Sequence, residues 1–130
     1  LVGWEEWLKR LCDSVEIFGE GYVIPNMVQG VEMAKPFGFD KVEDAVKSTS
    51  EGFEFLMSHG IVPRQNHWCV EKESYLKDNV SPPLDYFIQI NMKWYEIWNK
   101  YKLPPVAGFG HMGPGRSRNQ NSTFMEIGPG

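Results

Sequence analysis

The stretch NMVQGVE, residues 26–32, decides the fold because its apolar residues follow no helical spacing, whereas most other apolar residues of the chain do. It belongs to a longer run, YVIPNMVQGV at residues 22–31, which is apolar at odd and even positions and rich in β-branched residues. Such a run predicts a strand covered on both faces, as in a parallel sheet. Pro25 cannot donate to a sheet ladder, so we expect it at the start of the strand or at a bulge.

A helix is predicted before this strand and another after it. The first covers residues 4–18, where apolar residues recur at intervals of three and four, and Gly19 and Gly21 end it. Its apolar face comprises Trp4, Trp7, Leu8, Leu11, Val15 and Phe18. The second covers residues 40–60, with Asp40 as its cap, Glu43 reaching back to the cap and Gly60 closing it. Its buried face comprises Val42, Ala45, Val46, Thr49, Phe53 and Leu56.

A second strand and a third helix follow. IVPRQNHW, residues 61–68, is a short strand interrupted by proline, and Ser81, Pro82 and Pro83 open a helix that ends before Pro104. The broad stripe of this helix contains Leu84, Phe87, Ile88, Asn91, Trp94, Tyr95 and Trp98. The alternation of helices and strands predicts an α/β fold with a parallel sheet. Two strands leave exposed edges, so we expect further strands from the tail or from outside this sequence.

Composition restricts the class of protein. The chain has 130 residues, 42% of them hydrophobic and 14% aromatic, which excludes a disordered chain. A net charge of -4 provides no basic surface, so nucleic acid is not an expected partner. No apolar run approaches the roughly 20 residues of a membrane helix, and we expect a soluble, cytoplasmic protein with Cys12 and Cys69 as thiols. A chain that starts on Leu1 without an initiator Met is expected to be a fragment or a processed product.

The carboxyl end of the first strand is a candidate ligand site. In parallel α/β proteins, ligands bind where the carboxyl ends of strands meet the loops that follow. Gly30 lets the backbone approach a ligand closely, and Glu32 can accept hydrogen bonds from an amine or a ribose hydroxyl. The alternative is that Gly30 forms a bulge and Glu32 is a solvated loop carboxylate.

Residues 26–68, NMVQGVEMAKPFGFDKVEDAVKSTSEGFEFLMSHGIVPRQNHW, resemble the region from the fifth to the sixth strand of radical S-adenosylmethionine (radical SAM) enzymes of the biotin-synthase-like group. In that group the fifth strand carries G-x-I-x-G-x-x-E. The matching positions are Val28, Gly30 and Glu32, and Val62, Pro63 and Asn66 are similar to the following strand. This sequence departs from the pattern at two points: Asn26 replaces or shifts the first glycine, and one residue is missing between Gly30 and Glu32. The resemblance implies a partial TIM barrel, with residues 1–105 as the C-terminal half-barrel and 106–130 as a Gly-rich loop or tail.

The resemblance also implies a cofactor site. Met27, Val28, Gly30, Val62 and Pro63 would line the adenine of S-adenosylmethionine, and Glu32 would orient the loop. The CxxxCxxC motif that binds the [4Fe-4S] iron-sulfur cluster is absent. We therefore expect the cluster ligands in a missing N-terminal half-barrel, and we expect this chain alone to be inactive in the radical step.

Substrate contacts are expected at the barrel mouth. There Arg64 and Asn66 would bind a small-molecule substrate, and the Arg64 guanidinium could hold a carboxylate of that substrate. His67 and Glu71 would act as catalytic residues, with His67 transferring protons. The segment GFGHMGPGR at residues 108–116 contains GxGxxG, but no helix is predicted after it, so we do not expect a dinucleotide site. Arg116 on this loop is a further candidate to bind an anionic substrate, unless the segment is a disordered tail.

Two other functions remain open. His67, Cys69 and Glu71 alternate and share a face of an extended segment, so they could ligate a metal together with His111, in a TIM-barrel enzyme that uses His67 and Glu71 as acid and base. The alternative is an ordinary strand end. Separately, the stripe of Trp94, Tyr95, Trp98 and Tyr101 is either core or the exposed aromatic face of a non-catalytic, partner-binding domain.

Overall fold

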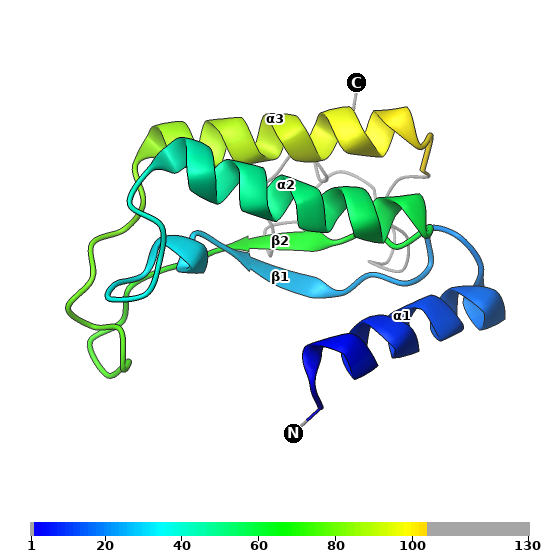
Figure 1. Cartoon of the computed structure of the whole chain (residues 1–130), viewed down its shortest axis with the longest axis horizontal. Helices are drawn as coiled ribbons and strands as arrows, with labels where there is room; N and C mark the ends of the chain where they lie inside the picture. The colour runs from blue at the N-terminus through cyan, green and yellow to red at the C-terminus, as the bar shows by residue number, and fades with distance from the viewer. Residues whose placement is uncertain (1, 104–130) are drawn as a thin grey trace, which may run out of the picture.

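The computed structural model describes residues 2–103, which form three α-helices, one short 3-10 helix and two strands (Figure 1). In chain order these are α1 (Trp4–Phe18), β1 (Asn26–Gln29), η1 (Val31–Met33), α2 (Val42–Ser58), β2 (Arg64–His67) and α3 (Leu84–Lys100). The predicted order of elements is confirmed. The predictions for residues 106–130, including the role of Arg116, lie outside the described residues.

The two strands pair in parallel, as predicted. Asn26 lies opposite Arg64 and Gln29 lies opposite His67, and a separate bridge joins Val23 to Ile61 upstream. The predicted strand at residues 22–31 is too long, because the regular strand begins after Pro25 and ends before Gly30. Gly30 adopts a φ of 100°, in the left-handed region, and turns the chain directly into η1. Pro25 therefore stands immediately before the strand, in one of its two predicted places.

Helices α2 and α3 pack together over one face of the sheet (Figure 1). The core between them contains Ala45, Val46, Phe53, Met57, Val62, Tyr86, Ile90, Trp94, Ile97, Trp98 and Leu103. The opposite face of β1 is not covered in the same way, because the Val28 side chain is 49% exposed. The expectation of a strand buried on both faces is therefore wrong for β1. The apolar run reflects one buried face and one open face.

The predicted limits of α2 are partly right. Gly60 takes a φ of 80° after the helix, as expected of a closing glycine. Asp40 does not cap the helix: α2 begins at Val42, and the Asp40 carboxylate pairs instead with the Lys35 ammonium. This pairing draws the Asp40 side chain toward the preceding loop.

Within residues 2–103, helix α1 packs against its neighbours through one side. Leu8, Leu11, Cys12 and Val15 pack against a small cluster of Val23, Leu56 and Ile61. None of the residues of α1 is buried, and Trp4 is 59% exposed. The amphipathic face predicted for this helix is therefore present but only half covered.

The aromatic residues of α3 belong to the core. Trp94 is 2% exposed and Trp98 is 8% exposed, and Tyr95 and Tyr101 are partly buried against the same cluster. The alternative of an exposed aromatic face for a partner is therefore wrong. The predicted stripe was also too broad, because Leu84 and Ile88 point into solvent.

The structure confirms a mixed α/β fold with a two-stranded parallel sheet in residues 2–103. These residues do not show a barrel. No helix in the described part of the chain has both the length and the apolar character needed to cross a membrane.

Candidate functional site

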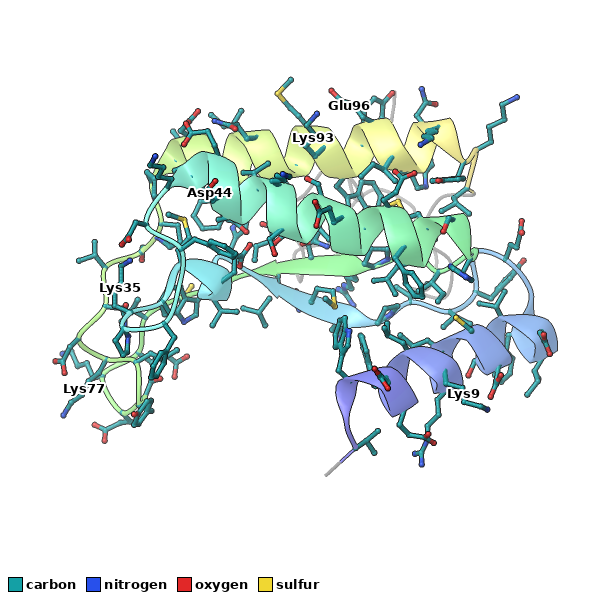
Figure 2. The ribbon with its side chains drawn as sticks, in the orientation of Figure 1. Lys9, Lys35, Asp44, Lys77, Lys93 and Glu96 are labelled. Atoms are coloured by element: carbon teal, nitrogen blue, oxygen red, sulfur yellow. The ribbon has the colours of Figure 1, made fainter. Side chains whose placement is uncertain are left out.

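The carboxyl ends of β1 and β2 lie at the same end of the sheet, as parallel pairing requires. The Trp68 amide donates to the Gln29 carbonyl at 2.9 Å, which extends the ladder to this end. The loops after the two strands are joined there, because the Asn79 side chain accepts from the Lys35 amide at 2.6 Å and donates to the Lys35 carbonyl at 3.3 Å. Lys35 and Lys77 mark these loops in Figure 2.

Gly30 is packed against the chain itself. A Cβ atom at this position would lie 2.8 Å from Cγ of Pro82, in the segment before α3. The Gly30 amide is shared between Oε2 of Glu32, at 2.8 Å, and the hydroxyl of Tyr86, at 3.1 Å, and its carbonyl accepts from the Met33 amide at 3.0 Å. The close approach that glycine permits here is therefore to Pro82, and both of its backbone polar groups already have partners.

Glu32 connects three elements at this end of the sheet. Its Oε1 accepts from Oγ1 of Thr49 on α2, at 2.6 Å, and from the hydroxyl of Tyr86 on α3, while Oε2 accepts from the Gly30 amide. Burial, reinforced by the Glu32 carboxylate, raises the pKa of Tyr86 far above its ordinary value, so Tyr86 stays a donor. Glu32 is not a solvated loop carboxylate. It holds the turn after β1 against both helices.

The two faces of the sheet carry different side chains. Nε2 of Gln29 donates to Oδ1 of Asn91 on α3 at 2.7 Å, so Gln29 points toward the helices. Because side chains alternate along a strand, Met27 and its partner Gln65 share that face, while Val28 and its partner Asn66 point the other way. Asn26 and Arg64 share the face of Val28, which we name the open face of the sheet.

The residues predicted to line adenine differ in how exposed they are and in the face of the sheet on which they lie. Val62 and Pro63 are fully buried, and the Pro63 carbonyl accepts from Nε1 of Trp94 at 2.8 Å. Met27 is half-buried on the helix side, and only Val28 is widely exposed. The predicted lining is therefore not one continuous surface. Of the predicted substrate-binding residues, Arg64 is 7% exposed and Asn66 is half-buried, both on the open face.

His67 is the last residue of β2 and lies opposite Gln29, on the helix side of the sheet. The His67 ring lies 4.8 Å from the Phe87 ring on α3, and its partial burial lowers the pKa of this imidazole below the ordinary value. Glu71 is exposed in the loop that follows, where its carbonyl accepts from the Ser74 amide at 3.1 Å. Among residues 2–103, no group of three or more His, Cys, Asp or Glu side chains is placed to hold a metal ion. His67, Cys69 and Glu71 therefore do not form a ligand set by themselves, and a site completed by His111 lies outside the described residues.

Several polar residues near the sheet were not predicted. Gln29 and Gln65 are each 1% exposed, and within the described residues Oε1 of Gln29 and Nε2 of Gln65 have no hydrogen-bond partner. Asn91, Thr49 and Tyr86 were also missed as members of a polar network, although Asn91 and Thr49 were expected on buried faces. The available signal was a glutamine within an otherwise apolar strand, since buried polar side chains need partners.

An open groove with a volume of 490 Å³ runs between α2 and α3 on the surface away from the sheet. Its lining includes Glu43, Glu51, Glu54 and Glu96, with Lys47 and Lys93. Lys93 pairs with Glu96 on α3 at 3.3 Å, on the outer side of the molecule, and both are labelled in Figure 2. Glu54 pairs with Lys100 at 2.6 Å and Glu96 pairs with Lys93, so these carboxylates already have partners, and we take the strand ends and the open face as the candidate site.

Comparison with protein-family models, with curated proteins and with solved structures finds no match to this chain.

Proposed function

We propose that this chain is the C-terminal part of a radical SAM enzyme, in which it contributes part of the adenosine pocket and of the substrate mouth. The cluster and S-adenosylmethionine would supply the 5'-deoxyadenosyl radical for hydrogen abstraction from a small-molecule substrate. The described residues do not fit the [4Fe-4S] cluster, because they contain no group of three ligands. In this proposal the cluster ligands come from an N-terminal half-barrel.

One observation carries the proposal. Val28 is an apolar strand residue that is 49% exposed, one residue before the buried end of β1 and directly opposite the amide side chain of Asn66. An apolar floor beside an amide suits a flat, polar-edged base such as adenine, which needs one apolar contact surface and a few hydrogen bonds at its rim. The motif match at Val28 and Asn66 supports the same assignment.

The roles of the other candidate residues follow from their contacts. Gly30 and Glu32 act as positioning residues, because their polar groups bind Thr49, Tyr86 and each other. Val62 and Pro63 are fully buried, so in this proposal they support the strand from within the core. Asn66 remains the proposed contact on the open face, and Arg64, which is only 7% exposed there, remains the proposed carboxylate-binding residue. His67, on the helix side of the sheet, and Glu71, in the loop after β2, remain the proposed catalytic residues.

The test uses S-adenosylhomocysteine, a stable analogue, in an NMR titration of the 130-residue chain. Because only part of the pocket is present, we expect a Kd of about 1 mM or weaker. The expected result is that the Val28 methyl and Asn66 side-chain amide resonances shift most. Val28→Asp should raise the Kd followed through the Asn66 side-chain amide by about tenfold or more, equivalent to about 1.4 kcal/mol.

The matched control is Ile17→Asp, since Ile17 is an apolar residue of α1 that is 76% exposed and lies outside the sheet. It should leave the titration unchanged. The open face is not an adenosine site if saturable shifts are confined to residues of the groove between α2 and α3. The same conclusion follows if the titration of Val28→Asp is the same as that of the original chain.

A further inference from the structure

The outer edges of β1 and β2 differ in their capacity to accept another strand. The Val62, Arg64 and Trp68 amides donate to the carbonyls of Val23, Pro25 and Gln29, so the odd-numbered residues of β1 direct their backbone groups toward β2. In a parallel ladder, alternate residues bond to opposite sides. The N–H and C=O groups of Ile24, Asn26 and Val28 therefore point to the outer edge of β1, where the described part of the chain has no strand.

The outer edge of β2 is less suited to pairing. By the same alternation it presents the backbone of Pro63, Gln65 and His67. Pro63 has no N–H group, and its carbonyl already accepts from Nε1 of Trp94. The β1 edge, in contrast, offers an N–H at each of its three positions.

The elements before β1 repeat those before β2. Both α1 and α2 run opposite to the strand that follows them, and α2 connects β1 to its neighbour β2 (Figure 1). Helix α1 lies beside the outer edge of β1, and its first turn is on the side toward which both strands run. By this repetition α1 would follow a strand at that edge, just as α2 follows β1. A strand at that edge would also account for the half-covered apolar face of α1, none of whose residues is buried.

We infer that the outer edge of β1 receives a third strand, parallel to β1 and packed beneath α1. This strand would pair with the backbone of Ile24, Asn26 and Val28 and would place every second, apolar side chain against Trp7 and Leu8 of α1. Its identity as part of a radical SAM barrel rests on the proposed function. Its pairing with β1 rests on the backbone geometry alone.

The experiment measures residue-resolved amide exchange by NMR, first in the 130-residue chain and then in a fusion. The fusion places a strand of about five alternating Val and Thr residues before Leu1, through a linker of about four residues, the usual length of a β-to-α connection. In the unfused chain the Asn26 and Val28 amides should exchange about tenfold or more faster than those of Met27 and Gln29. In the fusion they should slow by at least about tenfold.

Two proline variants provide the controls. Asn26→Pro removes an outward N–H and should keep the fold of the unfused chain while abolishing the new protection. Met27→Pro removes an N–H directed at β2 and should unfold the sheet in both forms. The inference is wrong if the Asn26 and Val28 amides are already protected in the unfused chain, if their protection depends on protein concentration, which would indicate a second copy, or if the fusion leaves them unchanged. Adenosine binding is not measured here, so this result is independent of the proposed function.

Discussion

Oε1 of Glu32 accepts a hydrogen bond from Oγ1 of Thr49 at 2.6 Å, which ties the turn after β1 to helix α2. The same carboxylate accepts from Tyr86 on α3 and from the Gly30 amide. One side chain therefore determines how the strand end sits relative to both helices. This relationship makes Glu32 a structural requirement for any site at this end of the sheet.

Replacing Glu32 by alanine should destabilise the fold. The change leaves the hydroxyls of Tyr86 and Thr49 without their acceptor and leaves the Gly30 amide with Tyr86 alone, which costs about 1–3 kcal/mol for buried groups. Urea denaturation followed by circular dichroism measures the loss. Glu32→Ala in a Tyr86→Phe background should cost less than Glu32→Ala alone, and equal costs in both backgrounds would refute the coupling.

Gly30→Ala and Gly52→Ala should have opposite effects. At Gly30 the φ of 100° and a Cβ position 2.8 Å from Pro82 predict a loss of about 2 kcal/mol or more. At Gly52, inside α2, an added Cβ meets no atom within 4 Å, so alanine should stabilise by about 0.5–1 kcal/mol. Thermal unfolding of both variants is the measurement. A neutral Gly30→Ala would mean that this turn is free to rearrange.

The buried pair of Gln29 and Asn91 predicts a non-additive double mutant. Gln29→Leu or Asn91→Leu alone leaves one buried amide without its partner and should cost about 1–3 kcal/mol, whereas the double variant should cost less than the sum of the two. Gln89→Leu is the control, because its bond to Asp85 is exposed and its loss should change stability by about 0.5 kcal/mol at most. Additive costs at Gln29 and Asn91 would argue against the pair.

His67 should make stability depend on pH. Its burial lowers the pKa in the folded state, so the unfolded chain binds the proton more readily. The contribution of His67 is therefore complete above the unfolded pKa of about 6.5 and is lost as pH falls below it. Phe87→Ala should expose the ring and move the His67 pKa back toward its ordinary value in an NMR titration. An unchanged pKa would show that Phe87 is not the source of the burial.

Local sequence patterns were sufficient for the elements and their order. The three helical stripes, the glycines after α1 and α2, and the apolar runs around Met27 and Val62 are signals carried by neighbouring residues. They predicted parallel pairing because the strands alternate with helices. They did not predict the strand limits, because Pro25 and Gly30 bound a shorter ladder than the apolar run suggests.

Only the tertiary structure decided how the residues of the candidate site are used. Spacing placed Gly30 and Glu32 at a strand end. It could not show that Pro82 packs against Gly30 or that the Tyr86 hydroxyl is hydrogen-bonded to both Gly30 and Glu32, because these partners are more than 50 residues away in the chain. Nor could it show that Val28 points away from the helices while Gln29 points toward Asn91. Such long-range contacts depend on how α3 packs over the sheet, and one sequence contains no local signal for that packing. The sequence by itself determined the secondary structure and the end of the sheet at which the strands stop, whereas packing between distant segments decided which side chains at that end remain open.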